Sequence, residues 1–170
     1  MKEKSKIKDQ KSKMLERGFT ILELVMAMGF MVMMLALVTI NFGNVQRQGS
    51  VTTASETLIT DLSQQQIKAM VGDTEGRVAN DDYGIKFNST NYTLFHGTYS
   101  ALETTNFSVN LPEIVRVDTT FANSEIIFLK GSGEIKDFVD GSNTITLRET
   151  INSNQKTIRF NRYGVITQVN

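Results

Sequence analysis

The sequence predicts an α+β protein in which one long amino-terminal helix precedes a β-rich head. Three observations support this fold class. An apolar run extends from Phe19 to Ile40, helical spacing of apolar residues continues to about residue 72, and short β-branched or aromatic runs follow it. We expect the helix to pack on a carboxyl-terminal antiparallel sheet, or on a head of two sheets.

Four segments follow from this pattern. They are a basic leader at 1–18, a transmembrane and assembly helix at 19–40, an amphipathic continuation of that helix at 41–72 and a β-rich head at 73–170. A chain of 170 residues has room for about one ordinary soluble domain once a membrane segment is set aside.

The apolar run is long enough to cross a bilayer once. Its 22 largely apolar residues would cover about 33 Å as a helix. A secretory signal peptide is less favoured, because signal cores have about 7 to 15 apolar residues and end at a small-residue cleavage site. The leader holds seven basic residues against three acids, which predicts a cytoplasmic amino terminus and a head on the other side.

The second part of the predicted helix has one apolar face. Its members recur at spacings of three, four, four and seven positions and are Val51, Ala54, Leu58, Leu62 and Ala69. A cluster of glycines and polar residues at 72–76 predicts the end of the helix.

The remaining chain predicts about eight short strands separated by turns rich in Asn, Asp, Ser and Gly. The expected strands are 83–87, 92–96, 107–111, 114–117, 125–130, 144–148, 156–161 and 165–169. Ile145 alternates with Leu147, and Ile158 with Phe160, which indicates sheets with one buried and one wet face.

Glu23 is the only ionisable residue between Phe19 and Ile40. A charge at the centre of a bilayer costs roughly 2.5 to 3.5 kcal/mol on insertion scales, so this carboxylate is expected to have a partner. Two alternatives stay open: a carboxylate that reaches the lipid headgroups, and a carboxyl group that is protonated and neutral.

The order of these parts resembles a known family. A short basic leader, the motif Gly18-Phe19-Thr20-x-x-Glu23, an apolar helix and a β-rich head are similar to type IV prepilins and type II secretion pseudopilins. The strand pattern that ends at 157–166 resembles the GspH/FimT group of minor pseudopilins, whose heads pack two sheets.

The resemblance implies a role for each residue of the motif. A prepilin peptidase of the inner membrane would cut between Gly18 and Phe19 and methylate the new amine of Phe19. Glu23 would meet the terminal amine of a neighbouring subunit during assembly. The implied partners are this peptidase and methyltransferase, other pseudopilins or pilins, an inner-membrane assembly platform and membrane lipid. The implied location is the bacterial inner membrane, as a single-pass protein, and then a filament.

The resemblance therefore predicts a minor pseudopilin of a type II secretion-like pseudopilus. One alternative is a minor type IV pilin that acts in pilus assembly or DNA uptake. Another is an anchored binding domain that is never processed. DNA is the less favoured partner, because residues 19–170 carry eleven basic residues against fifteen acids.

No catalytic or cofactor site is predicted. His96 is the only histidine and stands at no recognisable catalytic spacing, and the chain has no cysteine. Asp137, Asp140 and Asn143 are oxygen ligands at a loose spacing, and calcium requires six to eight oxygens in a defined geometry. We therefore expect no metal, no cofactor and no enzymatic activity.

Overall fold

The computed structural model describes residues 19–151 and 154–170, and for residues 38–48 it describes only the helical backbone. The described chain is α+β and contains one long helix, α2 (Ile21–Val71), one short 3-10 helix, η1 (Ala122–Ser124), and two antiparallel sheets. The chain divides into two compact units between Asn44 and Val45. The predicted α+β class is confirmed.

The second unit, from Val45 onward, holds eight strands in two four-stranded sheets. Sheet A has the order β3-β2-β1-β5, and sheet B has the order β4-β6-β7-β8. The strands are β1 (Tyr83–Asn88), β2 (Asn91–His96), β3 (Phe107–Asn110), β4 (Val115–Thr119), β5 (Glu125–Phe128), β6 (Thr144–Glu149), β7 (Gln155–Phe160) and β8 (Ile166–Val169). The eight predicted strands are thus present, and their ends differ from the prediction by three residues or fewer.

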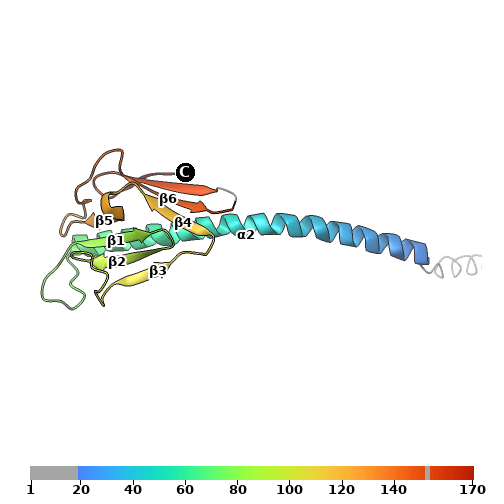
Figure 1. Cartoon of the computed structure of the whole chain (residues 1–170), viewed down its shortest axis with the longest axis horizontal. Coiled ribbons are helices and arrows are strands. Elements are labelled where there is room, and N and C mark those ends of the chain that lie inside the picture. Colours follow the sequence, from blue (N-terminus) through green and yellow to red (C-terminus); the bar gives the residue numbers. More distant parts are fainter. Residues whose placement is uncertain (1–18, 152–153) are drawn as a thin grey trace, which may run out of the picture. The chain divides into compact units, whose positions relative to one another are not determined.

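The strands gather around the carboxyl-terminal part of α2 (Figure 1). The apolar face predicted from spacing is buried, and its members form one core with residues of both sheets: Val51, Ala54, Leu58, Leu62 and Ala69. Leu58 is completely buried. An amphipathic helix of this kind is stabilised by the sheets that cover its apolar face rather than by helix propensity alone.

Alternation along the strands also matches the prediction. Ile145, Leu147, Ile158 and Phe160 are buried, whereas Arg159 is exposed. Gly84 of β1 faces a crowded site, since a Cβ atom built there would lie 2.6 Å from Cζ of Phe95 and 2.8 Å from the backbone oxygen of Ile126. Only glycine fits between these neighbours.

Helix α2 ends where glycine was expected to end it. Gly72 has φ +67°, a left-handed conformation that glycine adopts at low cost. The Asp73 amide donates a hydrogen bond to the Lys68 carbonyl at 3.0 Å, and the Gly72 amide donates one to the Ala69 carbonyl at 3.3 Å. These two bonds satisfy carbonyls that the last helical turn leaves unpaired.

The predicted membrane crossing at 19–40 is wrong, and so is the location derived from it, a single-pass inner-membrane protein. No helix in the described part of the chain combines the length and the apolar character that a bilayer crossing requires.

Candidate functional site

The motif that the sequence analysis singled out lies at the start of α2. Gly18 is outside the described residues, and Phe19 is the first residue described, with its side chain 80% exposed. Thr20 is the residue just before the helix, and its Oγ1 accepts a hydrogen bond from the Glu23 backbone amide at 3.2 Å. Its carbonyl accepts the first helical bond, from the Leu24 amide, at 3.0 Å. Thr20 is therefore the N-cap of α2.

Glu23 occupies the third helical position, three residues after this cap. The arrangement Thr-x-x-Glu is the capping-box pattern, and an acid in the first turn also interacts favourably with the helix dipole. The Glu23 side chain is exposed. Capping of the helix and its dipole thus give one reason for a glutamate at position 23. Because the side chain is exposed, its carboxylate is also accessible to a second group.

The first turns of α2 expose apolar side chains on every side. Thirteen large apolar residues from Ile21 to Leu37 have exposed fractions between 54% and 83%. They are Ile21, Leu22, Leu24, Val25, Met26, Met28, Phe30, Met31, Val32, Met33, Met34, Leu35 and Leu37. A helix that is apolar all round requires an apolar environment, and a patch of this extent marks an interaction surface.

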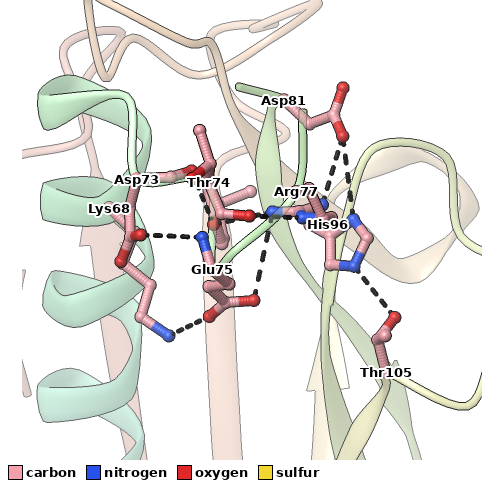
Figure 2. A network of polar contacts seen from close by, with 9 residues as sticks. Lys68, Asp73, Thr74, Glu75, Arg77, Asp81, His96 and Thr105 are labelled. Atoms are coloured by element: carbon pink, nitrogen blue, oxygen red, sulfur yellow. Dashed lines mark hydrogen bonds and ion pairs between the residues drawn. The ribbon is translucent and has the colours of Figure 1, made fainter. Parts of the chain in front are cut away.

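A polar network joins the end of α2 to the loop that follows it and to β2 (Figure 2). Lys68 Nζ lies 2.6 Å from Glu75 Oε1, and Arg77 Nη1 lies 3.1 Å from Asp81 Oδ2. Arg77 Nη2 also donates to the Tyr83 hydroxyl at 2.8 Å. Burial, followed by the charge of Glu75, raises the pKa of the Tyr83 hydroxyl above its ordinary value.

His96 belongs to this network as a structural member. Its Nε2 lies 2.8 Å from Thr105 Oγ1, and its Nδ1 lies 3.8 Å from Asp81 Oδ2. These two contacts on opposite sides of the imidazole fix the orientation of the ring.

Two of the three oxygen ligands considered for calcium make other contacts. Asp140 Oδ1 accepts a hydrogen bond from the Gly141 amide at 3.0 Å and is exposed. Asn143 is buried, and its Nδ2 donates to the Phe160 carbonyl at 2.6 Å. Among residues 19–151 and 154–170, no group of three or more histidine or acidic side chains is arranged to hold a metal ion.

Two arginines of the head, which bear on DNA as a partner, are paired with acids. The Arg148 guanidinium pairs with Asp118, and Arg162 Nε lies 3.5 Å from Glu134 Oε2. Both arginines are more than half exposed, so these pairs contribute little to stability. They do reduce the local positive potential that a phosphate backbone would meet.

Sequence reasoning missed Gln65. This residue lies between Leu62 and Ala69, which are seven positions apart, on the buried face of α2, and it is only 3% exposed. Its position in the helical repeat was the available signal, because a polar residue at that position must enter the core.

Comparison with models of protein families, with curated proteins and with solved structures found no match to this chain. The resemblance to pseudopilins therefore stays a prediction that depends on the amino-terminal motif.

Proposed function

We propose that this chain is a minor pseudopilin, a structural subunit of a type II secretion-like pseudopilus. A prepilin peptidase would cut the chain between Gly18 and Phe19 and methylate the new amine. The observation that carries the proposal is the apolar surface of Ile21–Leu37, which is exposed on all sides and directly follows a capped helix start.

The occupant of this surface would be the corresponding helices of neighbouring subunits. One neighbour could cover only one stripe of the helix, because two packed helices share a single line of contact. A filament surrounds each helix with several neighbours and so covers the whole circumference. Five of the exposed residues are methionines, whose flexible side chains adapt to irregular packing: Met26, Met28, Met31, Met33 and Met34.

Glu23 would align the subunits. After cleavage the amine of Phe19 is a cation within an apolar assembly, and the exposed Glu23 carboxylate is the matching anion on the next subunit. Burying both charges as a pair avoids most of the cost of burying either one alone. The net gain in stability is small, so the pair specifies register more than it adds affinity.

The head would have a structural role. In the described part of the chain, three of the polar residues that the sequence offered for chemistry make structural contacts: His96 with Thr105, Asp140 with a turn amide and Asn143, through Nδ2, with β7. The pairing of Arg148 and Arg162 with acids favours a secretion filament over the alternative of a DNA-uptake pilin.

Mass spectrometry of the protein extracted from its native cells tests the proposal. The expected species begins at Phe19 and carries one additional methyl group on its amine. Replacing Gly18 by a bulky residue should yield the intact chain from Met1, because a side chain at the cleavage position blocks close approach of the peptidase. Recovery of the unmodified chain with its leader from native cells would refute processing.

A further inference from the structure

A cavity of about 620 Å³ lies on the outer face of sheet A. The sheet contributes Lys86 of β1 and Glu125 and Ile127 of β5 to its lining. These residues alternate with buried neighbours such as Ile85 and Ile126, so their side chains point away from the core. Small-molecule pockets usually have about 300 to 1,000 Å³, and this cavity therefore has room for a small ligand.

Three loops of the second compact unit form the walls of the cavity. Their lining residues lie within 97–99, 120–123 and 136–142. The first segment follows β2, the second follows β4 and the third precedes β6. A ligand in the cavity would therefore contact parts of the head that are distant in sequence.

Lys86 holds two of these loops against the sheet. Its Nζ donates to the Asn123 carbonyl at 2.5 Å and lies 3.7 Å from Glu125 Oε2. The same ammonium group lies 5.4 Å from the centre of the Tyr99 ring, which also meets the Phe95 ring edge to face at 5.3 Å between centres. The walls are thus held in place before a ligand arrives, which lowers the entropic cost of binding.

Polar side chains on the three loops have unused hydrogen-bonding groups. The hydrogen bonds and ion pairs between described residues leave four such side chains in the lining without a partner: Thr98, Asn123, Asp137 and Ser142. Three of them are exposed and Ser142 is half-buried, so a ligand can reach them. The hydroxyls and the amide offer both donors and acceptors, and the carboxylate accepts only.

The charges that line the cavity cancel. Two lysines, Lys86 and Lys136, face two acids, Glu125 and Asp137. Lys136 Nζ also lies 3.9 Å from Asp82 Oδ2, which is outside the lining. A cavity without net charge favours a neutral ligand over an ionic one.

The same walls carry apolar surface. Val139 is 60% exposed, Tyr99 is half-buried, and both line the cavity. A sugar presents C–H groups beside hydroxyls, and each hydroxyl both donates and accepts hydrogen bonds. A lining that mixes accessible polar groups with apolar surface suits a saccharide better than a purely apolar molecule.

We propose that this cavity binds a short neutral oligosaccharide. Asn123 and Asp137 form hydrogen bonds to its hydroxyl groups, and Tyr99 and Val139 contact its C–H groups. The site goes beyond the proposed role in a filament, because it lies in the head alone and does not depend on processing of the leader.

A titration of the full chain in mild detergent tests the site, with maltotriose, cellotriose and chitotriose as probes and NMR as the readout. At least one probe is expected to cause saturable shifts of the backbone amides of Thr98, Asn123 and Asp137. Trigalacturonate, an anionic trisaccharide, should bind more weakly than the best neutral probe, because it brings negative charge next to the Asp137 carboxylate.

Two variants remove polar side chains and keep the backbone of the loops. Asn123 and Asp137 have φ of +53° and +50°, left-handed values that glycine adopts at low cost. Asn123→Gly should weaken binding about three- to tenfold, and Asp137→Gly about tenfold or more, because hydrogen bonds to charged groups are stronger than neutral ones.

Ser124→Gly is the matched control. Ser124 also has φ of +53°, is exposed and does not line the cavity, so the affinity should stay unchanged. Three results would overturn the proposal: no saturable shift with any of the neutral probes, tighter binding of trigalacturonate than of every neutral probe, and unchanged affinity in folded Asn123→Gly and Asp137→Gly proteins. None of them depends on the leader, so the site and the proposed function can fail independently.

Discussion

The hydroxyl of Tyr92 donates a 2.5 Å hydrogen bond to the Asp61 carboxylate and so ties β2 to α2. Tyr92 is 1% exposed, and its ring packs in the common core of the helix and the two sheets. Hydrogen bonds to charged acceptors are stronger than those between neutral groups. This contact therefore fixes the helix against sheet A at one defined position.

We expect Tyr92→Phe to lower the free energy of unfolding by about 1.5 to 3 kcal/mol, the range for a hydrogen bond to a charged group. The ring and its packing remain, so the change reports the hydroxyl alone. Chemical denaturation followed by near-ultraviolet circular dichroism measures it. Tyr163→Phe is the matched control, since the Tyr163 side chain is 63% exposed, and its effect should be close to zero.

The same contact predicts a loss of stability in alkali. Burial, together with the bond to Asp61, raises the pKa of the Tyr92 hydroxyl above its ordinary value of about 10. A raised folded-state pKa means that the stabilisation is complete below about pH 10 and is lost as the pH rises further. The free energy of unfolding should fall by up to about 1.4 kcal/mol per pH unit for each such tyrosine.

Denaturation at several values between about pH 9 and pH 11 checks this slope. Tyr83, whose pKa is raised mainly by burial, adds to it in the same direction. The slope should therefore become shallower, but not vanish, in Tyr92→Phe. A slope that is identical in Tyr92→Phe and wild type would show that Tyr92 does not titrate differently in the two states.

The packing of α2 on the sheets predicts a large effect at Leu58. This side chain is completely buried in the core, so Leu58→Ala should destabilise the head by about 2 to 5 kcal/mol through lost burial and the cavity left behind. Ile67→Ala, on the same helix but 58% exposed, should cost far less. Equal losses at the two positions would contradict the described helix face.

Two glycines should respond in opposite directions to alanine. Gly84→Ala forces a Cβ against Phe95 and the Ile126 backbone oxygen, and overpacking of this kind typically costs about 1 to 3 kcal/mol. Gly49→Ala, within α2 and with no atom within 4 Å of the new Cβ, should raise stability by up to about 1 kcal/mol through helix propensity. Thermal denaturation of both variants measures the difference.

The proposed assembly predicts a selective defect at Glu23. Glu23→Gln keeps the size of the side chain but removes the charge that would pair with the amine of the next subunit. Cleavage should continue, whereas the amount of the protein in sheared filaments should fall by about a hundredfold or more, because a buried amine left unpaired costs several kcal/mol and each 1.4 kcal/mol is about a factor of ten. Immunoblots of filament and cell fractions measure both steps.

Glu56→Gln is the control for this variant, since Glu56 is an exposed acid on the same helix. Its filament content should match that of wild type. If Glu23→Gln also assembles normally, then the capping role of Thr20-x-x-Glu23 is a sufficient account of the glutamate, and the proposed pairing is refuted.

Predictions that depend on residues close together in the sequence were confirmed. Val51, Ala54, Leu58, Leu62 and Ala69 recur with the helical period and are buried, and the alternating residues of β6 and β7 point into the core. The glycine that ends α2 was also visible. These features follow from the backbone geometry of each element. Side chains three or four positions apart share one face of a helix, and side chains two positions apart share one face of a strand.

Hydropathy in one dimension was a weaker guide to the environment of the apolar segment. The run from Phe19 to Ile40 predicted a membrane crossing, and the described helix does not meet the requirement for one. An apolar stretch indicates that its surface must be covered. It does not show whether lipid or neighbouring helices cover that surface.

The amino-acid order alone therefore specified the element types, the buried helix face and the motif around Glu23. Folding in three dimensions decided the sheet orders β3-β2-β1-β5 and β4-β6-β7-β8, the bond between Tyr92 and Asp61, and the unsatisfied acceptor of Gln65. The reason is physical: periodicity depends on neighbours along the chain, whereas strand pairing and the partners of a buried polar atom depend on contacts between residues distant in sequence.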